Sequence, residues 1–250
     1  MRQPMIAGNW KMNGSSSSVK ELIAGIKAGM SSVNKAAVVV CPVALHIPQV
    51  MAAIAGSKIK CGSQNIGDQD KGAFTGELAG SMLKELGCEY AIIGHSERRS
   101  LYGESDELIA RRFAAARRSG LKPIFCIGET LAEREKGITN EVCARQIDAV
   151  IALEGVKALA DSVIAYEPVW AIGTGKTATP QQAQDVHAFI RGKIAKLDAA
   201  VAEKIQILYG GSMNAANAVE LLGQPDIDGG LIGGAALKAD DFLTICRAAG

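Results

Sequence analysis

The sequence lacks an excess of either charge. Its 250 residues include 27 Lys and Arg against 26 Asp and Glu, which leaves a formal net charge of +1. A neutral chain has no bulk electrostatic attraction for nucleic acid or for acidic lipid. We therefore expect neither a nucleic-acid partner nor a membrane partner, and any charged ligand must be bound by local groups.

The spacing of a metal site is also missing. The six cysteines are spread along the chain without a Cys-x-x-Cys pair, and no histidine cluster accompanies them. Zinc sites need such clustered ligands, so no metal is predicted. Cys41, Cys61, Cys88 and Cys126 lie in or beside apolar runs, where a free thiol behaves as a small hydrophobic side chain.

No apolar segment is long enough for a signal-sequence core or a membrane span. The first ten residues, MRQPMIAGNW, are too polar for either. Buried, reduced thiols fit a reducing compartment. The sequence therefore predicts a cytoplasmic protein.

What the chain does contain is a regular alternation of short apolar runs and longer amphipathic stretches. Most runs are apolar along nearly their whole length, as parallel strands covered on both faces are. The expected strands are residues 4–9, 37–41, 58–62, 89–93, 121–126, 161–167, 205–209 and 228–232. Val19, Leu22, Ile23 and Ile26 form a helical stripe between the first two. A later helix is expected to start at Glu104 or Ser105 and to end at Gly120.

No linker or low-complexity segment interrupts this alternation, so residues 1–250 are expected to form one domain. Eight strand-then-helix units in this length predict an α/β fold, a single-domain (β/α)8 or TIM barrel. A doubly wound open sheet is the alternative. In a barrel, functional residues follow the carboxyl ends of the strands. The polar and glycine residues at these positions are Asn9, Lys11, His95, Glu167, Gly210, Gly211, Ser212, Gly233 and Gly234.

Glu167 lies at the end of an apolar strand and is followed by a glycine-containing loop. Pro168 ends the strand, and Gly173 and Gly175 give the loop conformational freedom. A carboxylate on a strand tip beside a loop that can close suits proton abstraction. The alternative is a glutamate that faces solvent before an ordinary turn.

Two glycine-rich turns predict an anion site. Gly210–Ser212 and Gly233–Gly234 free backbone N–H groups that suit a phosphate dianion, and residues 234–237 are expected to open a short helix. Tight strand-to-helix turns are the alternative. His95 follows Gly94 at a predicted strand-to-helix turn, which favours a neutral ring. His46 and His187 have the surroundings of surface helices.

Six segments together resemble the triosephosphate isomerase family. They are GNWKMNG (8–14), GAFTGE (72–77), IIGHSERR (92–99), YEPVWAIGTGKTATP (166–180), YGGS (209–212) and DGGLIGGAAL (228–237). The resemblance implies that Glu167 is the base, that His95 polarises the carbonyl oxygens, and that Lys11 and Asn9 assist at the enediolate. It also implies phosphate binding by Gly173, Ser212, Gly233 and Gly234, a Glu97–Lys11 pair, and a packing role for Cys126 near the base. No cofactor is needed for such a reaction.

The resemblance further implies a homodimer. Residues 64–77 form a long polar loop, which would place Thr75 near the partner's Asn9 and Lys11; a solvated surface loop is the alternative. Ala236 and Met213 depart from the residues common in the family, and Ala236 puts hydroxyl support behind the Gly233–Gly234 site in doubt. Two other functions stay open, a barrel aldolase using Lys11 as a Schiff base and a non-catalytic sugar-phosphate-binding barrel.

Overall fold

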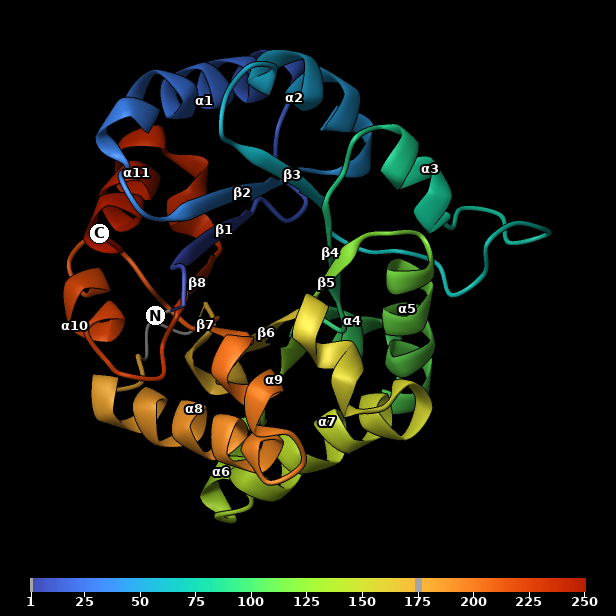
Figure 1. The fold of residues 1–250 in the computed structure, drawn as a ribbon. Coiled ribbons are helices and arrows are strands. Elements are labelled where there is room, and N and C mark those ends of the chain that lie inside the picture. The colour runs from blue at the N-terminus through green and yellow to red at the C-terminus, as the bar shows by residue number, and fades with distance from the viewer. Residues whose placement is uncertain (1, 174–176) are drawn as a thin grey trace.

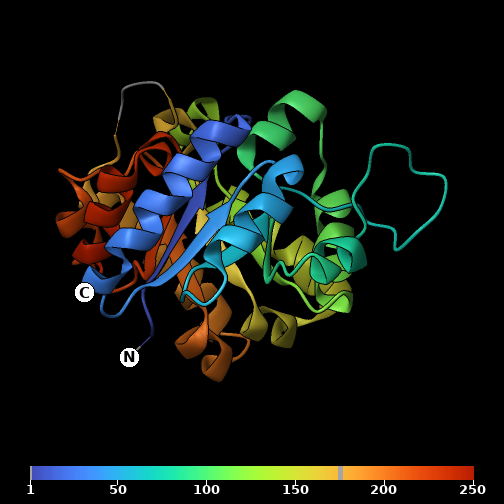
Figure 2. The same ribbon diagram turned by 90° about the horizontal axis from the view of Figure 1, so that it is seen from above.

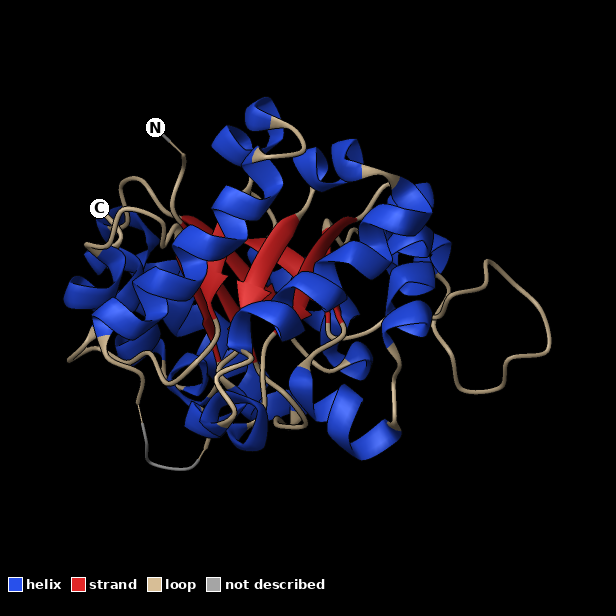
Figure 3. Ribbon diagram, turned by 90° about the horizontal axis from the view of Figure 1, so that it is seen from below, coloured by secondary structure: helices blue, strands red, loops and turns tan. Residues whose placement is uncertain are grey.

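Eight parallel strands close into a barrel in chain order in the computed structural model, which describes residues 2–173 and 177–250. The strands lie inside a ring of helices (Figures 1 and 3). They are β1 (Met5–Asn9), β2 (Ala37–Cys41), β3 (Lys60–Ser63), β4 (Tyr90–Ile93), β5 (Lys122–Ile127), β6 (Val163–Tyr166), β7 (Gln206–Tyr209) and β8 (Gly229–Ile232). Met5 of β1 pairs with both Ala37 and Gly229, which closes the sheet. The predicted barrel is therefore confirmed, and the open sheet is wrong.

The helices follow the strands and cover the outside of the barrel. They are α1 (Ser16–Gly29), α2 (Ile47–Ile54), α3 (Gly80–Glu85), α4 (Ser96–Tyr102), α5 (Asp106–Arg118), α6 (Leu131–Glu135), α7 (Thr139–Glu154), α8 (Pro180–Ala195), α9 (Ala199–Lys204), α10 (Ala218–Leu222) and α11 (Ala239–Ala248). Short 3-10 helices are η1 (Met30–Ser32), η2 (Ala44–His46), η3 (Val156–Asp161), η4 (Val169–Ala171) and η5 (Gly234–Leu237).

Local sequence signals explain the helix limits. In α1 the predicted stripe is buried through Val19, Ile23 and Ile26, so it packs against the sheet. Helix α5 begins after Ser105, whose side chain accepts a hydrogen bond from the Leu108 N–H, and it ends at Arg118 shortly before Gly120. Ser105 and not Glu104 is therefore the N-cap.

Both faces of the strands are buried, as the continuous apolar runs predict. Alternate side chains fill the barrel interior, and their neighbours pack outward against the helices. The interior set is Met5, Ala7, Val39, Cys41, Tyr90, Ile92, Ile124, Cys126, Val163, Ala165, Leu208 and Leu231. All six cysteines are free and buried, and four of them, Cys41, Cys61, Cys88 and Cys126, are those predicted to act as small hydrophobic groups.

The prediction that His187 has the surroundings of a surface helix is wrong. This side chain is 0% exposed and lies in α8 against Tyr166 and Tyr209, with ring centroids 5.8 and 6.5 Å away. His46 is partly exposed in the turn η2. The apolar face of α8 includes position 187, and a neutral imidazole fills it between the two tyrosine rings.

A long loop after β3 extends away from the barrel (Figure 2). Its residues 70–77 are exposed, so it is the long polar excursion that the sequence predicts. Within the described residues, every helix is too short or too polar to cross a lipid bilayer.

Candidate active site

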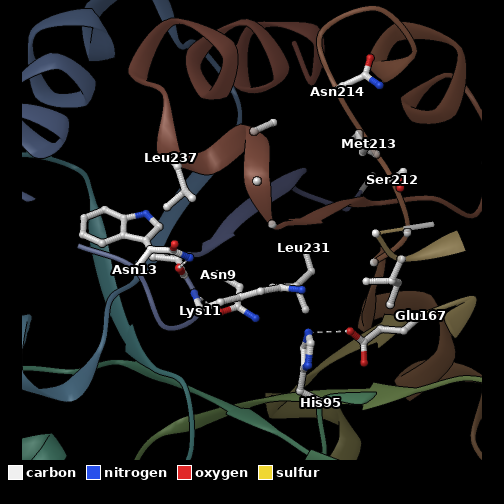
Figure 4. A pocket seen from close by; sticks show the side chains of 18 residues that line it. Asn9, Lys11, Asn13, His95, Glu167, Ser212, Met213, Asn214, Leu231 and Leu237 are labelled. Atoms are coloured by element: carbon white, nitrogen blue, oxygen red, sulfur yellow. Dashed lines mark hydrogen bonds and ion pairs between the residues drawn. The ribbon is translucent and has the colours of Figure 1, made fainter. Parts of the chain in front are cut away.

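A pocket of about 330 Å³ opens at the carboxyl ends of the strands, the end at which barrel proteins carry their sites. Figure 4 shows that Asn9 and Lys11 from the end of β1, His95 from the end of β4 and Glu167 from the end of β6 converge there. Gly173, Ser212, Gly233 and Gly234 complete the set of predicted residues in its wall. Gly175 and the loop tip through Lys176, part of the predicted lid, lie outside the described residues.

Glu167 follows the last residue of β6 and packs against two glycines, Gly128 and Gly210, at positions where any larger residue would overlap it. A Cβ atom on Gly128 would lie 1.8 Å from the Glu167 carbonyl oxygen, and one on Gly210 would lie 2.8 Å from Glu167 Cγ. The Glu167 N–H donates to the Ile127 carbonyl at 2.7 Å. The backbone of the base is thereby fixed to strand β5, and its side chain passes over Gly210.

The two oxygens of the Glu167 carboxylate have different surroundings. Oε2 accepts a hydrogen bond of 2.8 Å from the Ser96 N–H. Oε1 lies 2.9 Å from His95 Nε2, and although it is buried it has no hydrogen-bond partner among the described residues. Burial raises the pKa of Glu167, but the neighbouring His95 ring, the Ser96 N–H and the Lys11 ammonium lower it by more, so the pKa lies below its ordinary value. The group is therefore an ionised base with one unsatisfied oxygen.

His95 is the N-cap of α4, as its predicted place at a strand-to-helix turn requires. Its Nδ1 accepts a hydrogen bond of 3.2 Å from the Glu97 N–H, so Nδ1 carries no proton and a neutral ring has its proton on Nε2. Burial lowers the pKa of His95, but the Glu167 carboxylate raises it by more. A cationic ring would lose the Glu97 hydrogen bond, which opposes that rise.

Lys11 adopts a left-handed backbone conformation with φ of 51°, the only non-glycine residue with positive φ in the described part of the chain. The Asn9 side chain accepts from the Lys11 N–H at 3.0 Å, and the Gln64 amide donates to the Lys11 carbonyl at 2.8 Å. Its Nζ forms an ion pair with Glu97 Oε1 at 2.6 Å. The predicted Glu97–Lys11 contact is therefore present, and the ammonium reaches the pocket beside His95 and Gly233.

The glycine-rich turns form the other end of the pocket. The Ser212 hydroxyl donates to the Ala171 carbonyl at 2.6 Å, and the Met213 N–H turns back to the Gly211 carbonyl at 2.9 Å. Outside helices and strands, no backbone hydrogen bond of the described residues uses the N–H of Gly211, Ser212 or Gly234. These donors border the pocket, and the turn η5 starts at Gly234 as predicted.

Two predicted supporting residues lie away from the pocket wall. Cys126 is fully buried in the barrel interior, and the Glu167 carboxylate is close enough to help raise the pKa of its thiol, after burial itself. Thr75 is exposed on the projecting loop and does not contribute to the pocket of its own chain.

Several residues around the site have no strong signal in the sequence. Glu129 is 0% exposed and accepts hydrogen bonds from Trp170 Nε1 at 2.8 Å and from the Tyr166 hydroxyl at 3.0 Å. Ser96 holds Glu167 through its backbone. The position of Ser96 directly after His95 could have indicated its N–H, but nothing in the sequence pairs Glu129 with residues about 40 positions later.

The fold and the position of this pocket define a class, the (β/α)8-barrel proteins whose site lies at the carboxyl ends of the strands. The triosephosphate isomerase family model matches residues 4–249, nearly the whole chain. The chain belongs to the triosephosphate isomerase family, which is a family of isomerases.

Individual relatives agree with this assignment over their full length. A triosephosphate isomerase of Thiobacillus denitrificans is 59% identical over 249 residues, covering 100% of this chain and 99% of the relative. Those of Pseudomonas putida and Dechloromonas aromatica are 60% and 57% identical, and each alignment covers 100% of both chains.

Proposed function

We propose that this chain interconverts dihydroxyacetone phosphate and D-glyceraldehyde 3-phosphate by proton transfer through an enediolate. The observation that carries the proposal is the convergence of Glu167, His95 and Lys11 on one pocket that also exposes backbone N–H groups of the glycine-rich turns. The full-length likeness to proteins named triosephosphate isomerase supports the choice of substrate.

Glu167 is the base in this reaction. Its Oε1 takes a proton from the carbon next to the carbonyl, and the C–H electrons form the enediolate. The proton of the substrate's hydroxyl moves to the former carbonyl oxygen, the hydroxyl oxygen becomes the new carbonyl, and Glu167 returns its proton to the neighbouring carbon. The His95 Nε2–H and the Lys11 ammonium stabilise the charge that develops on the oxygens, with Asn9 beside them. The N–H groups near Ser212, Gly233 and Gly234 bind the phosphate, and Gly173 closes over it.

Substitution of the base tests this mechanism. Glu167→Gln keeps the size of the side chain but cannot accept the proton, so kcat should fall roughly 10²–10⁴-fold or more. In heavy water the wild-type protein should give product that contains deuterium. Glu203→Gln, at an exposed position, should behave as wild type. Near-normal turnover by Glu167→Gln, or brisk conversion without deuterium in the product, would contradict the proposal.

The geometry disfavours the aldolase alternative. Lys11 Nζ is held 2.6 Å from Glu97 in an ion pair, which stabilises the ammonium, whereas a Schiff-base lysine reacts as the free amine. Borohydride should therefore trap no substrate on Lys11. A non-catalytic barrel is tested by the isomerase assay itself.

We also propose that residues 1–250 act as one domain within a cytoplasmic homodimer. A groove of about 590 Å³ beside Lys11 and Glu97 is bordered by exposed apolar side chains, including Met12, Leu101 and Tyr102 at 93, 72 and 69% exposure. Such a patch is typical of a protein interface. The projecting loop with Thr75 is long enough to act as its complement in a second copy.

Sedimentation at assay concentration tests the dimer. The wild-type protein should sediment as two chains, and Met12→Asp should dissociate it and lower activity at the same concentration, because a charge replaces an apolar contact. Leu153→Asp, at a different exposed apolar position, should stay dimeric. A fully active wild-type monomer would refute the requirement for a partner.

A further inference from the structure

The segment that follows β7 is held by one side chain outside the set of residues assigned to the reaction. Asn217 Nδ2 donates to the Ser212 carbonyl at 2.9 Å, and Asn217 Oδ1 accepts from the Asn214 N–H at 2.8 Å. The two partners fix the orientation of the amide, because a flipped amide would face each of them with the wrong group. The Asn217 side chain therefore forms hydrogen bonds with the backbone on both sides of Met213.

The Asn214 side chain stabilises the same turn through hydrogen bonds of its own. Its Oδ1 accepts from the N–H groups of Ala216 and Asn217, at 2.9 and 3.3 Å, in the turn that leads into α10. The two asparagines thus exchange side-chain-to-backbone hydrogen bonds across four residues. Figure 4 shows the Asn214 side chain at the edge of the pocket, directed away from Lys11 and Glu167.

The hydrogen bonds of Asn217 determine which backbone N–H groups of this segment are available to a ligand. The Met213 N–H is used by Gly211 and the Asn214 N–H by Asn217. The N–H groups of Gly211 and Ser212 have no hydrogen-bond partner among residues 2–173 and 177–250 and lie beside the pocket, and the Ser212 carbonyl is directed toward Asn217. A carbonyl oxygen facing an anion would repel it, so holding this one aside favours phosphate binding.

The Ser212–Asn214 segment also contacts Ala171, near the start of the loop that follows β6. We call this part of the loop its stem. The Ser212 hydroxyl donates to the Ala171 carbonyl at 2.6 Å, and Met213 is only 4% exposed with its sulfur packed against Gly230. Ser212 is thus fixed at its hydroxyl, at its carbonyl and by its buried neighbour. Of these three anchors, the one at the carbonyl is provided by Asn217.

We propose that Asn217 is a positioning residue for phosphate recognition, which it achieves by fixing the Ser212–Asn214 backbone. The inference rests on the proposed function, since it takes the open N–H groups of this segment to bind the substrate's phosphate. Asn217 itself does not line the pocket and acts only through the segment. Its removal should weaken binding of phosphate groups and leave the proton-transfer residues in place.

Two variants test the proposal. Asn217→Ala removes both hydrogen bonds, and Asn217→Leu removes them while filling a similar volume, so that at least one folded variant is obtained. Asp198→Ala is the matched control, because Asp198 also forms two side-chain-to-backbone hydrogen bonds, here as an acceptor, at the start of a short helix, α9, away from the pocket. The measurements are the inhibition constant of inorganic phosphate, kcat and KM for the triose phosphate, and kcat/KM for unphosphorylated glyceraldehyde.

For the Asn217 variants, the phosphate inhibition constant and KM should rise roughly tenfold, on the scale of one or two lost hydrogen bonds. Turnover of unphosphorylated glyceraldehyde should stay within about twofold of wild type, and Asp198→Ala should change neither. Unchanged phosphate inhibition in the Asn217 variants, or an equal loss with both substrates, would overturn the inference.

A second readout separates this proposal from the proposed function. The rise of Tm with inorganic phosphate reports binding without catalysis. A wild-type protein that is stabilised by phosphate but does not isomerise would refute the function, and a smaller Tm rise in Asn217→Ala would still support the positioning role. A wild-type Tm that does not respond to phosphate, together with no inhibition, would overturn it.

Discussion

At the scale of single residues, the space around Glu167 is set by the absence of side chains. Gly128 lies against the Glu167 carbonyl oxygen, and Gly210 lies against Glu167 Cγ. A Cβ atom on either glycine would overlap Glu167. Protein interiors are packed at the density of organic crystals, so a side chain that is displaced has no empty space to move into. The position of the carboxylate therefore depends on residues that carry no chemistry.

Gly210→Ala tests this dependence. The new methyl group would lie 2.8 Å from Glu167 Cγ and 3.1 Å from the Tyr166 carbonyl oxygen, so the side chain of the base must shift. A displacement of about 1 Å at a reacting group costs about 10²-fold, and kcat should fall on this scale. Steady-state kinetics with the triose phosphate measures it.

Gly192→Ala is the matched control for this substitution. Gly192 lies in α8, where a Cβ atom would meet no neighbouring group of the described residues within 4 Å. Alanine should therefore leave kcat unchanged and stabilise the fold by about 0.4–1 kcal/mol. Wild-type kcat in Gly210→Ala would show that the site tolerates a shift of Glu167.

The residues that follow strand ends could be predicted because the barrel places them at one rim. Asn9, Lys11, His95 and Glu167 are each near a strand end in the sequence, and they share one pocket in the structure. Glu129 and Asn217 could not be predicted in this way. The partners of Glu129, such as Trp170, are brought to it by tertiary packing, and no spacing rule connects those positions. The partners of Asn217 are local, Ser212 and Asn214, but asparagines form such bonds in many turns, and the sequence alone does not show that this turn borders the pocket.

At the scale of elements, apolar runs located all eight strands, but pairing with the neighbouring strands decided where β3 and β6 begin. β3 starts at Lys60, two residues after the predicted limit, and β6 at Val163 instead of residue 161. Pairing with the neighbouring strand sets these limits, as Lys60 with Val39 does for β3. The partner strand is distant in sequence, so the apolar run alone cannot fix them.

The stem of the loop after β6 is anchored to the preceding unit by one buried carboxylate. Glu129 accepts from the Trp170 ring N–H and the Tyr166 hydroxyl, and the Arg134 guanidinium, 3.3 Å from Glu129, stacks over the Trp170 ring at 4.5 Å. Burial, followed by the charge of Glu129, raises the pKa of Tyr166, which stays a hydrogen-bond donor.

Glu129→Gln should destabilise the protein by about 1–3 kcal/mol, because the amide has one acceptor oxygen where the carboxylate has two and it loses the ion pair with Arg134. Urea unfolding measures the change in the free energy of unfolding. Tyr166→Phe, which removes only one donor, should cost about 0.5–1.5 kcal/mol. Equal stability of Glu129→Gln and wild type would show that the network does not anchor the stem.

At the scale of the whole molecule, the barrel leaves one histidine buried where its last strands meet the helices. His187 contacts the Asp226 carbonyl through Nδ1 at 3.2 Å, while its Nε2 has no hydrogen-bond partner among the described residues. Burial lowers the pKa of His187 from its ordinary 6.5 to about 4. The folded protein therefore keeps this ring neutral at pH values where the unfolded chain protonates it.

This difference predicts a loss of stability on the acid side. Above pH 6.5 the ring is neutral in both states and His187 adds no pH dependence. As the pH falls from 6.5 to 4, the unfolded chain binds the proton and the folded protein does not, so the free energy of unfolding decreases. Complete titration across this interval corresponds to about 3 kcal/mol.

His187→Phe isolates this contribution, because phenylalanine keeps a ring between Tyr166 and Tyr209 but cannot bind a proton. Whatever its stability at pH 7.5, the variant should lose about 3 kcal/mol less than wild type between pH 7.5 and pH 4. The rise in the pKa of His95 acts in the opposite direction, but it is common to both proteins and cancels in the difference. Parallel pH profiles of the two proteins, measured by urea unfolding, would mean that the buried ring takes up its proton without unfolding the barrel.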